Sequence, residues 1–244
     1  MVSIPPRGAF VTIEGIDGAG TTTQARLLVD WLNERGCTAH LTWEPSTGPV
    51  GLLLRDILAR RTREIDPAAV ALLFAADRVD HVRHEVEPHL ARGEHVVSDR
   101  YVYSSLAYQS QQQDLQWVAA INCLAPDPDL TVYLRTDPEL ARQRRARRGS
   151  AEEIFERDEL QQQIAAKYDE LLGSSSAAGS WGLDPTGSGW IRQDPTGSRP
   201  PLPWRPAAAI LDGALAVDTL QSQLRTLVQK VALARGTCKA GSGQ

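Results

Sequence analysis

A glycine-rich segment near the N-terminus carries the residues of this chain best suited to bind phosphate. Residues 10–24 have the sequence FVTIEGIDGAGTTTQ, an apolar strand followed by a tight turn and the start of a helix. The spacing from Gly15 to Thr22 fits the pattern G-x-x-x-x-G-K-[ST], whose backbone N–H groups surround phosphate and whose hydroxyl ligates Mg²⁺. Thr21 stands where the pattern has lysine. The segment predicts a phosphate site without its lysine; an ordinary glycine-rich turn is the alternative.

The loop keeps most of its attraction for anions without the lysine. Gly15, Gly18 and Gly20 permit a tight turn, and the helix expected from Thr21 adds about half a positive charge at its N-terminus. The chain has 23 arginines and only three lysines, none of them near the loop. We therefore expect any replacement cation to be an arginine.

Two further pairs of residues have types and spacing suited to nucleotide chemistry. Asp99-Arg100 ends an expected strand, where aspartate can hold Mg²⁺ through water and arginine can bind phosphate with two parallel hydrogen bonds. Phe74 and Arg78 lie four residues apart on an expected helix, so they could stack on a base and bond its edge. Taken singly, these pairs have plainer interpretations: a helix-start ion pair, and a core phenylalanine with a surface arginine.

A run of arginines follows the fourth expected strand. Residues 142–148, RQRRARR, place five arginines in seven positions. They suggest a lid over phosphates, with a solvated helix face or a nonspecific nucleic-acid patch as alternatives. A nucleic-acid protein is expected to be basic, whereas this chain has a net charge of −4. We therefore expect small-molecule nucleotides, and no nucleic acid, as partners.

Strands and helices alternate along the chain, which predicts a parallel sheet with helices on both faces. Asp66-Pro67 and Asp137-Pro138 each predict a helix start, because aspartate caps the helix and proline suits its first position. In such sheets ligands bind at the carboxyl ends of the strands, where residues 15–22, Glu44 and Asp99-Arg100 fall. The expected strands are near residues 10–13, 39–42, 94–98, 130–134 and 210–212. The expected helices are near 21–35, 50–60, 67–91, 104–110, 115–124 and 217–233, with another that begins at Pro138.

Length and composition predict one globular domain over residues 1–244. The chain is 42% apolar and 23% charged, enough to bury one sizeable core. No stretch suits a membrane span, and the N-terminus lacks the apolar core of a signal peptide. Cys37, Cys123 and Cys238 show no metal or disulfide spacing, so we expect a cytoplasmic protein with no membrane partner. Within the domain we expect a lid near 142–158, a low-complexity insertion near 173–206 in which DPTGS occurs twice, and a flexible tail at 236–244.

Four motifs in order resemble the thymidylate kinase family of nucleoside monophosphate kinases. EGIDGAGTTTQ resembles its P-loop except at Thr21, EPSTGPVGLLLR its second-strand motif, LLFAADR its base-stacking helix and SDRYVYSSLAYQ its D-R-Y segment. The resemblance covers roughly residues 10–172 and resumes at Ile210. It implies an α/β P-loop nucleoside monophosphate kinase fold, with a five-stranded parallel sheet and helices on both faces, and a homodimer.

The resemblance implies that the γ-phosphoryl group of ATP passes to dTMP with Mg²⁺, forming dTDP for dTTP biosynthesis. By similarity, ATP binds at Gly15, Ile16, Asp17, Gly18, Ala19, Gly20, Thr21 and Thr22. The residues implied for dTMP are Asp17, Glu44, Phe74, Arg78, Arg100, Ser105, Tyr108 and Gln109. Thr22 and Asp99 are implied for the metal, and Asp17, Arg100 and Arg148 for catalysis.

Three cationic positions depart from the family pattern. Thr21 replaces the lysine, Trp43 stands where an arginine commonly precedes Glu-Pro, and Glu153-Ile154 stand where the lid usually has Asp-Arg. Each lost charge-assisted contact costs about 1.5–3 kcal/mol, which predicts reduced activity. We expect a working kinase in which an arginine of residues 142–148 replaces the lysine. The alternatives are a nucleotide-binding pseudokinase with a regulatory or partner-binding role, and a kinase for another nucleoside monophosphate.

Overall fold

The computed structural model describes residues 7–148, 155, 157–173, 181–183, 190–192 and 208–234. Its centre is a five-stranded sheet of order β2-β3-β1-β4-β7, and every neighbouring pair is parallel. The expected five-stranded parallel sheet is therefore confirmed. Its strands are β1 (Phe10–Glu14), β2 (Ala39–Trp43), β3 (His95–Asp99), β4 (Leu130–Arg135) and β7 (Ala208–Asp212).

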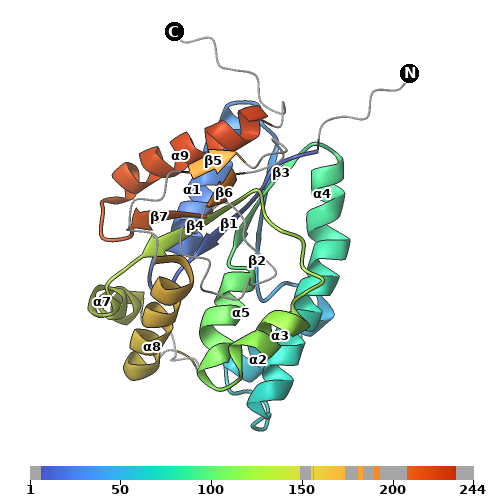
Figure 1. Ribbon diagram of the computed structural model, residues 1–244, viewed down its shortest axis with the longest axis vertical. Coiled ribbons are helices and arrows are strands. Elements are labelled where there is room, and N and C mark those ends of the chain that lie inside the picture. Colours follow the sequence, from blue (N-terminus) through green and yellow to red (C-terminus); the bar gives the residue numbers. More distant parts are fainter. Residues whose placement is uncertain are drawn as a thin grey trace.

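Helices cover both faces of this sheet (Figure 1). Helices α1 (Thr21–Glu34) and α9 (Val217–Ala234) pack together on one face, and α3 to α5 and α8 lie on the other. The remaining bounds are α2 (Pro49–Leu58), α3 (Pro67–His81), η1 (Val82–Val86), α4 (Glu87–Ala91), α5 (Val102–Tyr108), η2 (Gln109–Gln111), α6 (Leu115–Ile121), α7 (Pro138–Arg148), α8 (Asp158–Tyr168) and η3 (Asp169–Gly173).

Strand β1 lies at the centre of the sheet and is buried along its whole length. Phe10, Val11 and Ile13 contribute to the main hydrophobic core, as a strand covered on both faces requires. The buried Thr12 hydroxyl pairs with that of Thr131 on β4 at 3.0 Å, so these two polar groups do not lose their hydrogen bonds in the core. Because β1 is rigidly held, the loop that follows it has a fixed starting point.

Both expected helix caps are present. The Asp66 carboxylate accepts a hydrogen bond from the Ala68 N–H, and Asp137 accepts from the N–H groups of Glu139 and Leu140. The long helix expected to Ala91 is not continuous α-helix, because the π-helical segment η1 separates α3 from α4. Such segments insert an extra residue into a helical turn.

Two expectations about other parts of the chain have different outcomes. Cys37 is disulfide-bonded, so the expectation that no cysteine pairs is wrong; Cys123 is free and exposed.

Inside residues 173–206, β5 (Trp181–Leu183) pairs antiparallel with β6 (Trp190–Arg192). The rest of the insertion and residues 236–244 lie outside the described residues, so their expected character stays a prediction. Over the described ranges, no helix combines the length and the apolar character that a membrane span requires.

Candidate active site

The glycine-rich loop joins β1 to α1 as the sequence predicted. Strand β1 ends at Glu14 and α1 begins at Thr21, with Gly20 as its N-cap residue. Gly18 and Gly20 have φ angles of 93° and 96°, in the left-handed region that favours glycine. The loop therefore has the strand–turn–helix geometry in which backbone N–H groups can face an anion.

Helix α7 packs directly on this loop and brings arginines to it. A Cβ atom on Gly18 would lie 2.4 Å from the Ala141 carbonyl oxygen, so the two backbones are in close contact. Arg145 donates to the Asp17 carbonyl oxygen at 2.6 Å, and Arg144 donates to that of Ala19 at 3.4 Å. Two of the five candidate arginines thus reach the loop that lacks the lysine.

The other candidate arginines differ. Arg142 forms an ion pair with Glu139 on the surface of α7 and is 46% exposed, while Arg147 is also exposed. The side chain of Arg148, which was expected to be catalytic, lies outside the described residues, so its role stays a prediction.

Asp17 and Arg100 form the central ion pair of the site, with Arg100 Nη2 2.6 Å from Asp17 Oδ1. Arg100 also donates to the Gly15 carbonyl oxygen at 2.8 Å, and its φ of 77° turns the chain sharply after β3. Burial by itself lowers the pKa of Arg100, but Tyr108, Asp17 and other neighbours raise it well above its usual value. The guanidinium therefore stays charged beside the loop.

Thr22 and Asp99 lie together as the metal prediction requires. The Thr22 hydroxyl donates to Asp99 Oδ2 in a short hydrogen bond, although the two residues come from different elements. Among the described residues Asp99 Oδ1 is buried and has no hydrogen-bond partner. A hydroxyl beside a carboxylate with an unpaired oxygen fits Mg²⁺ held partly through water and substrate phosphates.

Arg78 is buried, so the interpretation of a surface arginine is wrong. Its side chain is 1% exposed and forms an ion pair of 2.7 Å with Glu44. It also donates to the Tyr101 carbonyl oxygen, the Ser105 hydroxyl and the Asn122 side chain. The structure thus brings together Glu44, Arg78 and Ser105, but their contact with a base stays a prediction.

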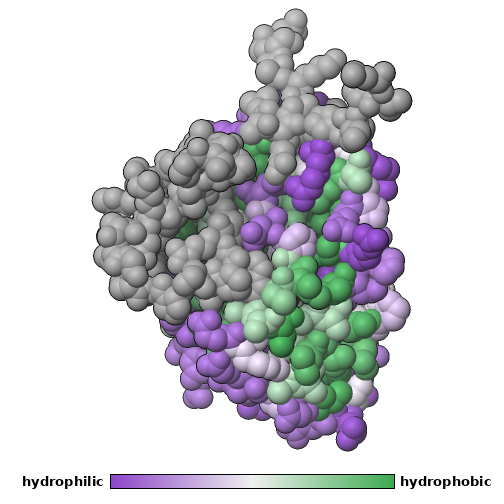
Figure 2. All heavy atoms as spheres, turned by 45° about the vertical axis from the view of Figure 1, so that its right-hand side comes forward, coloured by the Kyte–Doolittle hydropathy of each residue, from purple (hydrophilic) through white to green (hydrophobic). Residues whose placement is uncertain are grey.

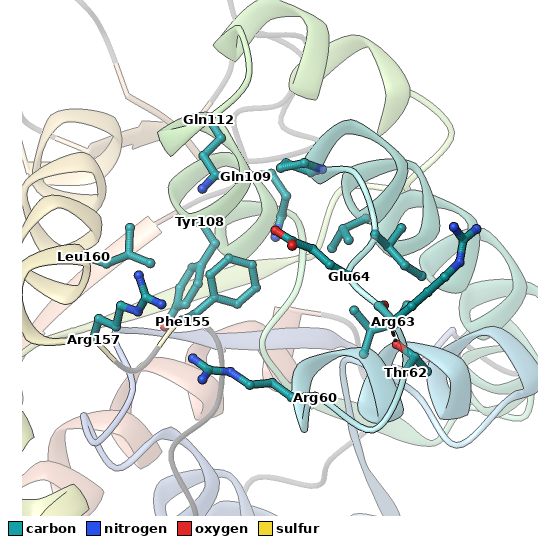
Figure 3. Close-up of a pocket in the computed structure, with 14 residues that line it drawn as sticks. Arg60, Thr62, Arg63, Glu64, Tyr108, Gln109, Gln112, Phe155, Arg157 and Leu160 are labelled. Carbon is teal, nitrogen blue, oxygen red and sulfur yellow. Dashed lines mark hydrogen bonds between the residues drawn. The ribbon is translucent and has the colours of Figure 1, made fainter.

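A pocket of about 510 Å³ lies beside this network (Figure 3). Figure 3 shows Tyr108 and Phe155 side by side at its centre, with Arg157 and Leu160 on one side and Arg60 below. Phe74 does not line the pocket but packs against the small apolar cluster of Leu54, Ile57 and Val70. The pocket is lined by Ile57, Arg60, Thr62, Arg63, Glu64, Ile65, Pro67, Val70, Tyr108, Gln109, Gln112, Phe155, Arg157 and Leu160.

Two polar atoms at the pocket make no hydrogen bond of good geometry among the described residues: the Tyr108 hydroxyl, which lies near Gln161 and Arg100, and Gln109 Oε1. Both side chains are more than nine-tenths buried, and burial raises the pKa of Tyr108 far above its usual value. Unpaired buried polar atoms are costly, so they indicate groups that a ligand can complete. The ring of Tyr108 also lies 5.1 Å from the Arg100 guanidinium, which joins the pocket to the loop.

Sequence reasoning missed two residues that the fold brings to the loop. Glu14 accepts hydrogen bonds from the Ser104 and Tyr168 hydroxyls, and burial raises the pKa of its carboxyl group. Gln161 on α8 bonds to Asp17 through both amide atoms. Neither has a spacing signature, because their partners are 90 and 144 residues away in the chain.

Comparison with known proteins agrees with this geometry. The sequence model described as thymidylate kinase matches residues 13–177. This chain belongs to the thymidylate kinase family. One similar curated protein is the probable thymidylate kinase of Pyrococcus abyssi, which is 42% identical over 66% of this chain and 82% of the relative. Another is the probable thymidylate kinase of Methanococcus aeolicus, which is 43% identical over 67% of this chain and 79% of the relative. The probable thymidylate kinase of Pyrococcus horikoshii is 41% identical over 66% of this chain and 82% of the relative.

Membership of the thymidylate kinase family makes the chain a nucleotide-binding transferase of the kinase class. The matched segment contains the loop, the Asp17–Arg100 pair and the pocket. It also contains Thr21, so the lysine is missing from within the matched region itself.

Proposed function

We propose that this protein phosphorylates dTMP to dTDP with ATP as the donor. The observation that carries the proposal is the position of Tyr108, whose ring lines the pocket and lies against Arg100 beside the loop. A nucleoside in the pocket would therefore have its 5′-phosphate close to Arg100 and the ATP phosphates. Family membership and the names of the relatives support dTMP as the acceptor.

The chain contributes positioning and charge rather than covalent chemistry. The loop would bind the ATP phosphates, Arg100 would hold the acceptor phosphate, and Asp17 would orient Arg100 and the nucleotide sugar. Thr22 and Asp99 would hold Mg²⁺, which neutralises phosphate charge when bound. The unpaired Tyr108 and Gln109 atoms would bind the nucleoside.

Arg144 and Arg145 are the proposed replacements for the lysine. Both already donate to carbonyl oxygens of the loop, and Arg145 also pairs with Asp158 at 3.0 Å. Arg142 instead pairs with Glu139. A guanidinium beside the loop can neutralise phosphate charge in place of the missing ammonium group.

We also propose a homodimer formed through α2 and α3. Leu52, Leu53, Leu72 and Val79 on these helices are 40–55% exposed. Figure 2 shows apolar residues gathered on the side of the molecule where these helices lie. A contiguous apolar patch favours a second copy of the chain. Light scattering should show twice the chain mass, and Leu72→Glu should halve it. The cytoplasmic location and the absence of a nucleic-acid partner stay predictions.

The decisive test is ADP release from Mg-ATP by purified protein with and without dTMP. Thymidylate-dependent ADP formation is expected. Saturable dTMP binding without ADP would instead indicate a pseudokinase, and faster turnover with dUMP, dGMP or dCMP would assign another substrate.

A further inference from the structure

Gln161 is an inaccessible polar residue whose hydrogen bonds converge on one residue of the loop. It is 0% exposed on α8. Its Oε1 accepts from the Asp17 N–H at 3.0 Å, and its Nε2 donates to Asp17 Oδ2 at 2.7 Å. One planar amide therefore pairs with the backbone and the carboxylate of the same residue, which only a group with both a donor and an acceptor can do.

The remaining polar atoms of Asp17 are also occupied. Its Oδ1 accepts from Arg100 at 2.6 Å, and its carbonyl oxygen accepts from Arg145 at 2.6 Å. The carboxylate is thus held between an arginine on one side and the Gln161 amide on the other. Removing either partner leaves the carboxylate held by the other one alone, so its position is less well fixed.

Gln161 also connects this carboxylate to the pocket. Its Nε2 donates to the Phe155 carbonyl oxygen at 2.8 Å, and Phe155 lines the pocket beside Tyr108. The phosphate loop and the pocket wall therefore share one side chain, which comes from the helix after the lid.

We infer that Gln161 is a positioning residue for the phosphoryl transfer, which fixes the Asp17 carboxylate against Arg100. The inference rests on the proposed function. Because Gln161 is 0% exposed, we expect it to act through Asp17 rather than on the substrate. It determines whether Asp17 and Arg100 meet the acceptor in one geometry, and misplacing such groups slows transfer strongly.

Gln161→Glu replaces the Nε2 group, which donates to the Asp17 carboxylate, with an oxygen and keeps the shape of the side chain. A glutamate at this position contacts Asp17 of the loop and lies near Tyr108 of α5. Arg100 and Arg145 bind that same Asp17, and Asp158 of α8 pairs with Arg145. Burial and the Asp17 charge raise the pKa of a carboxyl group here, while the charges of Arg100 and Arg145 lower it. Below that pKa the carboxyl group is neutral and donates to Asp17; above it, two carboxylates repel each other.

The expected result is a pH-dependent defect. At pH 8, kcat/KM for dTMP should fall about tenfold to a hundredfold relative to the wild type, and the deficit should shrink as the pH falls to 6. The defect should lie mainly in kcat. The matched control is Gln162→Glu, the same change at the exposed neighbouring position, whose activity should follow the wild type at every pH.

Amide hydrogen exchange of the peptide covering residues 15–22 gives a readout independent of activity. After correction for intrinsic rates, Gln161→Glu should lose protection at pH 8 and regain it at pH 6. A deficit of equal size at every pH, or protection that does not change with pH, would overturn the inference. If the wild type forms no ADP with dTMP, the proposed function fails, while exchange still decides whether Gln161 holds Asp17.

Discussion

The two sides of the active site differ in how completely their polar groups are paired. On the phosphate side, Asp17 receives hydrogen bonds from Arg100, Arg145 and Gln161. On the nucleoside side, the Tyr108 hydroxyl and Gln109 Oε1 have no partner among the described residues. The phosphate side is therefore preorganised by the protein itself, whereas the nucleoside side is completed by its ligand.

The largest expected effect tests the preorganised side. Arg100→Ala removes the contacts with Asp17 and Gly15 together with the proposed acceptor-phosphate contact. We expect kcat/KM for dTMP to fall about 10²- to 10⁴-fold, because at least two charge-assisted bonds are lost. ADP formation at varied dTMP measures it. Arg83→Ala, at a 78% exposed side chain, is the control; equal activities of the two variants would contradict the assignment.

The missing lysine allows the arginine proposal to be tested by a double-mutant cycle. Arg144→Ala and Arg145→Ala should each be compared in the wild type and in the Thr21→Lys background. At least one should lower kcat about tenfold to a hundredfold with Thr21 present and much less after Thr21→Lys, because one cation then replaces another. Arg142→Ala should have little effect in either background. Strictly additive effects would show that neither arginine substitutes for the lysine.

A substitution on the nucleoside side should weaken dTMP binding and leave the free energy of unfolding nearly unchanged. Tyr108→Phe removes a buried hydroxyl that makes no hydrogen bond of good geometry within the described residues, so the unliganded protein should keep its free energy of unfolding within about 0.5 kcal/mol. The KM for dTMP should rise about tenfold, since the proposed ligand contact is lost. Tyr133→Phe is the converse control, because that hydroxyl donates to Asp169 at 3.3 Å away from the pocket. A large loss of stability in Tyr108→Phe would refute a ligand-facing hydroxyl.

The contact of α7 with the loop gives a prediction about stability rather than about turnover. Gly18→Ala and Gly20→Ala impose the same left-handed strain, but only the first also places a Cβ against the Ala141 backbone; nothing lies within 4 Å of the second. We expect losses of about 2–4 kcal/mol for Gly18→Ala and about 1 kcal/mol for Gly20→Ala in urea unfolding without nucleotide. Equal losses would mean that α7 yields to the added methyl group.

Local patterns in the sequence predicted much of this molecule. The buried strand before Gly15, the loop glycines and the Asp66 and Asp137 caps depend on neighbours a few residues away, so their spacing is visible in the chain. The π-helical segment after His81 was not predicted, because the sequence was interpreted as one continuous helix from Pro67 to about Ala91.

The sequence by itself determined the parallel sheet, the phosphate loop and the absence of its lysine, since these follow from residue type and short-range spacing. Only the tertiary structure decided which arginines reach the loop, that Arg78 is buried on Glu44, and that Gln161 holds Asp17. Those contacts join segments from 34 to 144 residues apart, and their geometry depends on how whole helices pack over the sheet. No local pattern of residue types encodes such packing.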